Sequence, residues 1–286
     1  MKLSVELPIA SPDELMTCAL AIEEAGFDAC FVTDHPFPSR TWLTTGGHET
    51  LDPFVALSFA AAATRRLRLH TNCLIPAYRN PYVAAKAVAT LDACSRGRVV
   101  LGVAVGYLEP EFDALGVPFR ERARLLDEAL WAMKAAWAGE VADNIVTPRC
   151  VQLPHPPIWV GGNSAAAIRR AISHGSGWSP FPATPRTAAE VDTAAIADRA
   201  ALAAAIARLR ELAQHAGRAD PLDVCFTPFS HPAHTDTVDP GAFVAEAHEL
   251  ARIGVTWLAF HLPAPGVAAF CDNVAEFGAA VAEVRT

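Results

Sequence analysis

The chain has 286 residues, a length that suits one (β/α)8 barrel of roughly 250 residues without an added domain. Its 52% hydrophobic content predicts a large buried core, but no apolar run reaches the ~18 residues that a membrane span needs. A formal net charge of −8 argues against nucleic-acid binding, and the N-terminus lacks a signal-peptide pattern. We therefore expect one domain over residues 1–286, with no nucleic-acid or membrane partner.

The N-terminal half alternates predicted strands and helices. Ser11, Pro12 and Glu14 have the spacing of a helix capping box, and Gly26 ends that helix. Pro36 ends the second strand, because proline cannot donate to a β-ladder, and a polar loop is predicted over 36–50. The predicted strands are 2–7, 29–32, 67–75 and 98–105, and the predicted helices begin at 12, near 53, at 81 (to 91) and at 119 (to 137).

The C-terminal half continues the same alternation. Its predicted strands are 157–160, 177–179, 222–227 and 255–261, and its predicted helices are 165–173, 194–216, 240–252 and 267–284. Eight short apolar strands that alternate with eight helical segments are typical of an α/β fold, the (β/α)8 TIM barrel. An open, doubly wound sheet has the same alternation and remains an alternative.

The end of the second strand carries an acid and an imidazole. Thr33, Asp34 and His35 follow a buried apolar run, so they are expected where a parallel sheet opens to solvent. An imidazole there can exchange a proton with a bound ring or substrate near neutral pH. The alternatives are a core histidine bonded to backbone and an aspartate that caps the next turn.

Two glycine-rich stretches are candidate binding loops. Gly161, Gly162, Asn163 and Ser164 lie between a predicted strand and a predicted helix, where backbone N–H groups and the helix dipole favour a phosphate. The alternative is a tight turn in which Asn163 or Ser164 caps the helix. The second stretch runs from Gly102 to Gly106 and Tyr107, where a flat ligand can approach the backbone; the alternative is an ordinary turn with a packing tyrosine.

The end of the third strand is also polar. Thr71, Asn72 and Cys73 are small side chains inside an apolar strand end, which indicates a backbone that faces a ligand. Arg79, in the loop that follows, is either a partner for a phosphate or carboxylate or a solvated surface charge.

The cysteines and histidines give no metal or disulfide signature. The seven cysteines (18, 30, 73, 94, 150, 225 and 271) are isolated, and we interpret them as small buried hydrophobes of a reduced cytoplasm. His231 and His234, with His35 and His261, are candidates for a zinc site, but no H-x-H or H-E-x-x-H motif accompanies them. We therefore expect no metal, and no G-x-S-x-G motif indicates a serine nucleophile.

Taken in order, six stretches resemble the bacterial luciferase-like superfamily, and within it the coenzyme F420-dependent oxidoreductases. The resemblance runs from the first strand to about residue 182 and more loosely beyond. It implies a luciferase-like TIM barrel with a flavin or deazaflavin across the strand ends. The stretches are 24–35 (EAGFDACFVTDH), 51–57 (LDPFVAL), 77–81 (AYRNP), 91–98 (LDACSRGR), 102–112 (GVAVGYLEPEF) and 155–164 (HPPIWVGGNS) with 177–178 (GW).

The resemblance also implies a role for each site residue. His35 is the implied catalytic residue, placed to donate or orient a proton, and Asp34 is an implied anchor for the ring. A non-prolyl cis peptide is implied between Asn72 and Cys73, against the face of the ring. The remaining implied cofactor-binding residues are Ile75, Gly106 and Tyr107 along the ring, and Gly161, Gly162, Asn163 and Ser164 at the coenzyme phosphate.

Two departures from the family pattern matter. Tyr107 stands where the sugar-phosphate dehydrogenase branch has a catalytic glutamate, and Glu109 is not a safe substitute, so His35 is expected to work alone. The segment 139–151, before the fifth strand, is shorter than in most relatives. We expect part of the pocket wall to be missing there or to come from a neighbouring subunit.

The resemblance implies hydride transfer between coenzyme F420 and an unidentified small organic substrate, with the protein supplying orientation and electrostatics. One alternative is an FMN-dependent two-component monooxygenase fed by a separate reductase. A second is a barrel that binds a ligand with weak or no turnover. A cytoplasmic homodimer or higher homo-oligomer is also implied.

Overall fold

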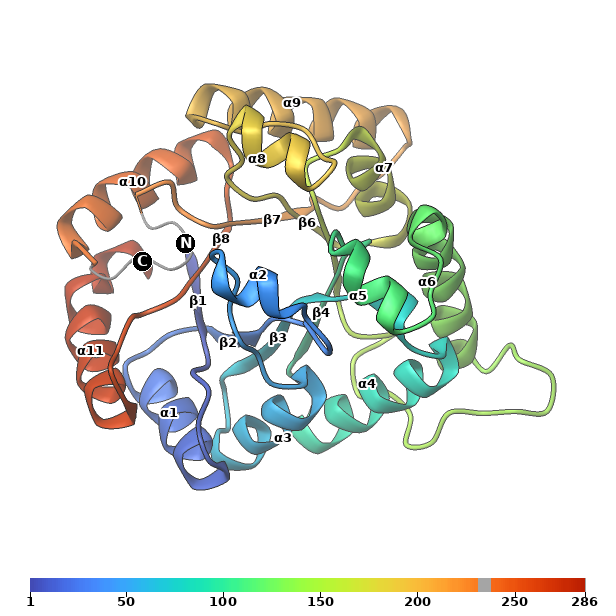
Figure 1. The fold of residues 1–286 in the computed structure, drawn as a ribbon, viewed down its shortest axis with the longest axis horizontal. Helices are drawn as coiled ribbons and strands as arrows, with labels where there is room; N and C mark the ends of the chain where they lie inside the picture. The colour runs from blue at the N-terminus through green and yellow to red at the C-terminus, as the bar shows by residue number, and fades with distance from the viewer. Residues whose placement is uncertain (231–237, 286) are drawn as a thin grey trace.

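Short apolar runs form a closed ring of parallel strands in the computed structural model, which describes residues 1–230 and 238–285. The strands follow one another around the ring in chain order, and β8 pairs with β1 (Figure 1). The predicted (β/α)8 barrel is therefore confirmed, and the open-sheet alternative is wrong. The strands are β1 (Lys2–Glu6), β2 (Ala29–Val32), β3 (Arg68–Leu74), β4 (Val99–Val103), β5 (Ile158–Gly161), β6 (Gly177–Ser179), β7 (Asp223–Phe226) and β8 (Trp257–Phe260).

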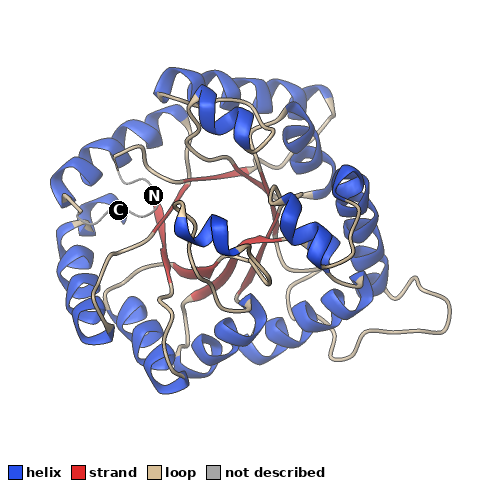
Figure 2. Ribbon diagram, in the orientation of Figure 1, coloured by secondary structure: helices blue, strands red, loops and turns tan. Residues whose placement is uncertain are grey.

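Helices surround the barrel and cover its outer face (Figure 2). No helix in residues 1–230 or 238–285 is long and apolar enough to cross a membrane. The helices are α1 (Pro12–Glu24), α2 (Arg40–Thr44), α3 (Pro53–Ala63), α4 (Pro81–Ser95), α5 (Glu109–Ala114), α6 (Arg122–Ala138), α7 (Ala165–His174), α8 (Pro185–Glu190), α9 (Arg199–His215), α10 (Pro240–Ile253) and α11 (Val267–Ala280), with the 3-10 turns η1 (Pro76–Tyr78), η2 (Phe119–Glu121) and η3 (Ala282–Arg285).

Several helices begin where the sequence supplies a capping side chain. The N–H of Ser11 donates to Glu14 Oε2 at 2.9 Å, which closes the predicted capping box of α1. Asp52 and Asn80 accept backbone N–H bonds at the starts of α3 and α4. These bonds satisfy donors that a helix end leaves unpaired, and they fix where each helix leaves the strand before it.

Three short helices were not predicted. α2 lies inside the segment predicted as a polar loop, and α5 and α8 also lie in loops that follow strands. None is longer than six residues, so the 3.6-residue hydrophobic period cannot show in their sequences. All three lie at the end of the barrel where the strands finish, which is where such folds place their binding sites.

The core has two layers, because alternate residues of each strand face opposite sides of the sheet. The outer layer packs the strands against the helices and includes Leu3 and Val5 of β1. His70 lies with the inner layer, where burial lowers the pKa of its imidazole to about 3. The inner layer consists of Ala29, Phe31, Val100, Trp159, Cys225, Trp257 and Ala259.

The segment 139–151, which was predicted to be shortened, lies together with residues 152–157 at the opposite end of the barrel from the strand ends. Gln152 Nε2 donates to the carbonyl of Val99, the first residue of β4, at 2.8 Å, and to Asp92 Oδ1 at 2.7 Å. The rest of the segment projects beyond α4 and α6 in Figure 1. The expectation that its shortness removes part of the pocket wall is therefore wrong, because the segment follows α6 and returns the chain to the start of β5.

Candidate active site

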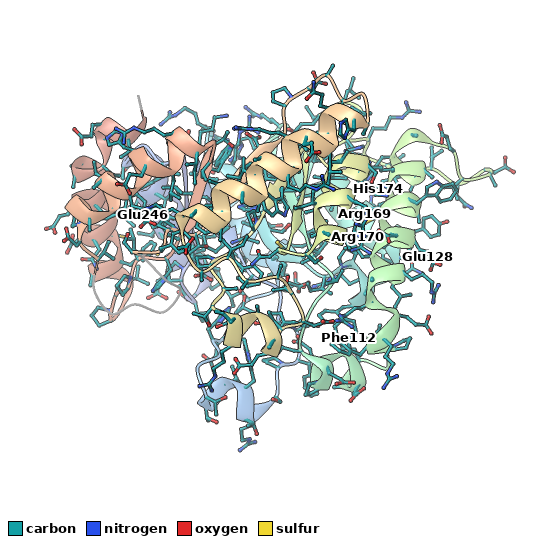
Figure 3. The ribbon with its side chains drawn as sticks, turned by 90° about the horizontal axis from the view of Figure 1, so that it is seen from above. Phe112, Glu128, Arg169, Arg170, His174 and Glu246 are labelled. Atoms are coloured by element: carbon teal, nitrogen blue, oxygen red, sulfur yellow. The ribbon has the colours of Figure 1, made fainter. Side chains whose placement is uncertain are left out.

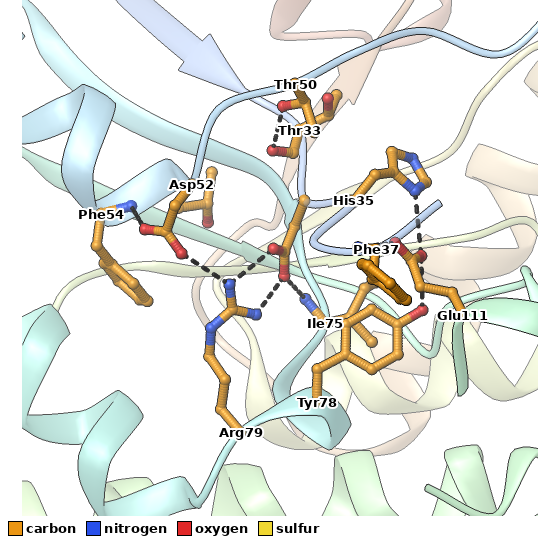
Figure 4. A network of polar contacts seen from close by, with 12 residues as sticks. Thr33, His35, Phe37, Thr50, Asp52, Phe54, Ile75, Tyr78, Arg79 and Glu111 are labelled. Atoms are coloured by element: carbon orange, nitrogen blue, oxygen red, sulfur yellow. Dashed lines mark hydrogen bonds and ion pairs between the residues drawn. The ribbon is translucent and has the colours of Figure 1, made fainter. Parts of the chain in front are cut away.

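Asp34 is tightly bound at the end of β2. Its carboxylate, on a residue 3% exposed, accepts the N–H of Ile75 at 2.9 Å and two N–H groups of Arg79 at 2.6 and 2.8 Å (Figure 4). Both oxygens are engaged, so Asp34 ties β2 to the turn after β3. Its predicted contact with a cofactor ring remains a prediction, and these partners make it a positioning residue for Ile75.

Arg79 links the carboxylate of Asp34 to that of Asp52. Its guanidinium also lies 3.2 Å from Asp52 Oδ2, at the cap of α3, and over the ring of Phe54. Burial lowers the pKa of Arg79, but Asp34 and Asp52 outweigh that effect and hold the pKa above its usual value. The interpretation of Arg79 as a solvated surface charge is therefore wrong, and its carboxylate partner is internal.

His35 has an acidic partner that sequence reasoning missed. Its Nδ1 lies 3.4 Å from Oε2 of Glu111, which α5 carries and which is 1% exposed. Glu111 also accepts the N–H of Phe37 at 2.9 Å and the hydroxyl of Tyr78 at 3.1 Å (Figure 4). The expectation that His35 works alone is wrong, because the chain supplies a carboxylate four residues after Tyr107.

These bonds keep Glu111 charged. Burial raises the pKa of its carboxyl, but the hydrogen bonds from His35, the Phe37 N–H and Tyr78 outweigh burial and hold that pKa below its usual value. In return, burial and the charge of Glu111 raise the pKa of the Tyr78 hydroxyl, which stays protonated. The α5 carboxylate is thus a fixed acceptor for a proton on Nδ1 of His35.

Aromatic rings surround the imidazole of His35. The centroids of the Trp42, His48 and Tyr107 rings lie 4.6, 5.3 and 5.9 Å from it. Burial and then the charge of Glu111 raise the pKa of Tyr107 to about 12, so its hydroxyl is a donor at neutral pH. Trp42 comes from α2, one of the unpredicted helices, and no periodic pattern pointed to it.

The third strand ends as the resemblance implied. The Asn72–Cys73 peptide bond is cis, and the register of β3 on β4 shifts between Thr71 and Leu74. A Cβ atom added to Gly161 would lie 2.8 Å from Sγ of Cys73, so glycine at 161 lets β5 approach this turn. The cis bond is therefore confirmed, while contact of Asn72 and Cys73 with a cofactor remains a prediction.

Gly106 is buried beneath the site. Its φ is +80°, and an added Cβ would lie 2.7 Å from the ring of Phe112 and 3.2 Å from Ile75. A side chain at this position is excluded both by conformation and by space. The predicted contacts of Gly106 and Ile75 with a ring are not tested by these distances, which show the turn packed on α5.

The glycine-rich stretch after β5 forms a capped turn. Ser164 Oγ accepts the N–H of Ala167 at 3.1 Å as the N-cap of α7. The N–H of Gly162 donates to the Ser179 carbonyl at 3.1 Å, and the N–H of Asn163 donates to Thr193 Oγ1 at 3.2 Å. The N–H groups of Gly162 and Asn163, which were predicted to bind a phosphate, thus donate to partners within the chain. The N–H groups that remain for a phosphate are those at the start of α7.

Glu6, at the end of β1, is a second group that sequence reasoning missed. It faces the barrel interior, on the same side of β1 as Ser4, which pairs with Ala259 of the inner layer. Burial raises the pKa of Glu6 to about 7. It lines a cavity of about 150 Å³ together with His48, Glu49 and His261. A strand-end carboxylate alone was too weak a signal to identify it.

The structure locates the seven cysteines and two of the four candidate zinc ligands. Within residues 1–230 and 238–285, no three His, Cys, Asp or Glu side chains are grouped to hold a metal ion. Two of the candidate zinc ligands, His231 and His234, lie outside the described residues. All seven cysteines are free thiols, but Cys94 is exposed and only Cys18, Cys30 and Cys225 are fully buried, so the prediction of buried cysteines holds for these three.

Comparison with known proteins identifies a family whose sequence model matches this chain. The family model described as luciferase-like monooxygenase matches residues 3–250. The chain is 38% identical over 183 residues to an uncharacterized protein of Mycobacterium tuberculosis, covering 56% of this chain and 64% of that one. It is 41% identical over 134 residues to an F420-dependent glucose-6-phosphate dehydrogenase of Beutenbergia cavernae, covering 46% of this chain and 38% of that one. The chain thus spans less than two thirds of the length of these relatives.

One solved structure shows the same barrel over the full length. The coenzyme F420-dependent tetrahydromethanopterin reductase from Methanopyrus kandleri matches with a TM-score of 0.75 at 18% identity, covering 99% of this chain and 98% of that one. At this identity the likeness concerns the fold, and the chemistry depends on the residues at the strand ends.

Proposed function

The chain belongs to the luciferase-like monooxygenase family, and on that basis we propose that the carboxyl end of its barrel binds coenzyme F420 and transfers hydride between the coenzyme and a small organic substrate. The observation that carries the proposal is the contact of His35 Nδ1, at the end of β2, with the buried carboxylate of Glu111. The 41% identity to an F420-dependent dehydrogenase supports F420 over FMN.

The inward positions at the strand ends suit a flat ring on one side. Gly161 pairs with Ser179, and Ala104 follows β4 beside them, with its Cβ 3.3 Å from a Cβ built on Gly161. Small side chains therefore face the barrel axis at these three positions, and Cys73 packs close to Gly161. Glu6 and His48 lie on the other side, where a polar substrate has partners. The small inward residues on one side, and the carboxylate and imidazole on the other, support the proposal of a flat deazaflavin ring beside a polar substrate.

His35 handles the proton in this proposal. The bound coenzyme supplies the hydride chemistry, and the protein supplies position and charge. Glu111 accepts from Nδ1 of His35, which leaves Nε2 to take a proton from a substrate hydroxyl or return it to a carbonyl. Because Glu111 stays charged, it also stabilises the imidazolium that forms after proton uptake.

The sugar-phosphate substrate of the F420-dependent glucose-6-phosphate dehydrogenase is not assigned to this chain. Tyr107 occupies the place of the catalytic glutamate in the sugar-phosphate dehydrogenases that the sequence resembles. Its hydroxyl, with a pKa of about 12, donates a hydrogen bond but does not act as a base at neutral pH. We therefore propose a substrate that is not a sugar phosphate, with His35 in place of the acid–base glutamate.

The coenzyme is tested by titrating the purified protein with F420 and with FMN while following fluorescence. We expect saturable quenching of F420 in the micromolar range and much weaker binding of FMN. A preference for FMN would support the two-component monooxygenase instead. No binding of either coenzyme would contradict both and leave a ligand-binding barrel.

The role of His35 is tested separately with the His35→Ala variant. Because His35 handles the proton and not the coenzyme, the variant should keep F420 affinity and lose roughly a hundredfold or more in kcat. Turnover at the wild-type rate would remove His35 from the mechanism.

A further inference from the structure

A second cavity, of about 440 Å³, lies at the end of the barrel where the strands begin. Pro157 and Ser176, which immediately precede β5 and β6, line it. It is thus separated from the candidate active site by the length of the barrel. Four basic side chains from four parts of the chain converge on it: Lys134 of α6, His155 before β5, His174 at the end of α7, and Arg218 after α9.

This basic cluster, defined as Lys134, His155, His174 and Arg218, has no acidic counterpart in its wall. Among the described residues that line the cavity, none is Asp or Glu. The carboxylate of Asp127, on α6, is engaged by Arg170 at 2.6 and 3.0 Å. Figure 3 shows Arg170 on α7 near His174 and α6. In a chain with a net charge of −8, a cavity whose ionisable side chains are all basic is unusual.

The other nearby carboxylate is also occupied. Asp92, which is fully buried, accepts the N–H of Val151 at 2.7 Å and both the backbone N–H and the amide of Gln152 at 3.0 and 2.7 Å. Gln152, although it lines the cavity, therefore directs its amide inward to Asp92. Among the described residues, no carboxylate forms an ion pair with Lys134, His155, His174 or Arg218.

Backbone carbonyls hold the basic groups in place. Lys134 Nζ donates to the His174 carbonyl at 2.6 Å, and Arg218 Nη1 donates to the Ile172 carbonyl at 2.7 Å. Nδ1 of His155 lies 2.8 Å from the Pro156 carbonyl, so its other nitrogen carries the remaining bonding capacity. These neutral acceptors fix the side chains and leave further donors on the ammonium and guanidinium groups.

The pKa values of three side chains in the cluster agree with a positive electrostatic potential in the cavity. Burial, followed by the charge of Arg218, lowers the pKa of Lys134. Burial and Lys134 lower the pKa of His155, although the Pro156 carbonyl raises it. Burial, Lys134 and Arg170 likewise lower the pKa of His174 against the opposing charge of Asp127. For Lys134, His155 and His174, burial is the largest cause, and the charge of a neighbouring base adds to it.

We propose that this cavity binds a small molecule carrying a compact dianion, such as a phosphate monoester or a dicarboxylate. Its volume falls within the range of small-ligand sites, roughly 300–1,000 Å³. At neutral pH the wall of this cavity carries the charges of Lys134 and Arg218, and the Arg218 guanidinium is a planar donor that suits phosphate and carboxylate oxygens. The site is independent of the proposed F420 chemistry.

Equilibrium titration with inorganic phosphate, with sodium chloride at matched ionic strength as the reference, tests the proposal. We expect saturable binding that weakens at least tenfold in Arg218→Gln, because one charged contact is lost. Arg169→Gln is the matched control, since Arg169 is an exposed base on α7 that does not line the cavity (Figure 3). It should bind phosphate as the wild type does.

Parallel titrations with glycerol phosphate and with succinate decide between the two sources of dianion. Binding of either one that depends on Arg218 supports the site and identifies its ligand class. Should Arg218→Gln fail to fold, as judged by its circular dichroism spectrum, Lys134→Gln replaces it and is expected to show the same loss. Equal affinity in the wild type and the cluster variants, or binding that does not saturate, would overturn the proposal.

A nuclear magnetic resonance measurement locates the ligand. Addition of phosphate should shift the ring resonances of His155 and His174, because each imidazole gains an anionic neighbour. The resonances of His35, at the opposite end of the barrel, should not move. Shifts confined to His35, or to the start of α7, would place phosphate at the candidate active site and contradict this assignment.

Discussion

Glu111 decides how His35 behaves in this site. Its carboxylate is buried, charged and shared between His35, Tyr78 and the backbone of Phe37. A glutamine at this position keeps the size of the side chain but loses the charge that stabilises an imidazolium. The proposed chemistry therefore depends on the charge of one carboxylate beside His35.

We expect Glu111→Gln to lower kcat by roughly tenfold to a hundredfold and to leave the dissociation constant of F420 unchanged. The pH profile of kcat should also move, because His35 loses its charged neighbour. Glu109→Gln is the control: Glu109 is exposed, two residues away on the same helix. Equal effects of the two substitutions would show that Glu111 does not act through His35.

Glu6 makes stability depend on pH. Burial raises its folded-state pKa from 4.5 to about 7, so the folded state binds a proton more tightly than the unfolded state does. The stability from neutral Glu6 is fully present below about pH 4.5 and is lost as the pH rises through about 7. Between these values, the free energy of unfolding should fall with rising pH.

Urea denaturation of Glu6→Gln tests this sign. The unfolding free energy of the variant minus that of the wild type should rise by roughly 2–3 kcal/mol from about pH 4 to about pH 8. The difference grows because only the wild type loses stability as the buried carboxyl ionises. Glu49→Gln, an exposed carboxylate at the same cavity, is the control and should show no such gain. If the difference in unfolding free energy between Glu6→Gln and the wild type does not change with pH, then Glu6 is charged in the folded protein at neutral pH.

At the scale of elements, the ion pair of Asp34 with Arg79 joins the end of β2 to the turn after β3. Arg79→Met leaves Asp34 buried with only the Ile75 N–H, and we expect it to cost about 3 kcal/mol of unfolding free energy. The double variant with Asp34→Asn should recover part of that loss. Arg124→Gln, in an exposed ion pair on α6, should cost roughly 0.5 kcal/mol or less.

Denaturation of the four proteins measures these differences. A cost of Arg79→Met no larger than that of Arg124→Gln would show that the buried pair does not hold the turn.

The strands and long helices were predictable because their signals are local. Apolar runs, capping residues and terminal glycines lie within a few residues of the features that they specify, as Ser11 and Glu14 do for α1. α2, α5 and α8 are too short for a hydrophobic period to show. The turn at Gly162 and Asn163 depended on partners at Ser179 and Thr193, which no local pattern indicates.

The active-site partners were hidden for a related reason. His35 and Glu111 are 76 residues apart, and only the closed barrel brings α5 over the end of β2. The resemblance led to Tyr107 as the position of interest, while the carboxylate stands four residues later. Arg79 was underrated because its partner Asp34 lies 45 residues away on another strand.

At the scale of the whole molecule, the two proposed sites lie at opposite ends of the barrel. The end where the strands finish carries the small inward residues and the pair of His35 and Glu111. The opposite end carries the basic cluster. A parallel barrel exposes these two ends to solvent independently, so a substitution at one end should leave ligand binding at the other intact.

The most direct test of the central claim is an F420 titration of a variant whose strand ends are blocked. Ala104→Trp places a large ring above Gly161 without entering the inner core, because Ala104 is half-exposed. Ala204→Trp, on the exposed face of α9, is the control. We predict that the wild type and Ala204→Trp quench F420 fluorescence with the same micromolar dissociation constant, and that Ala104→Trp, folded by circular dichroism, binds at least tenfold more weakly. Equal binding by all three proteins would contradict the account.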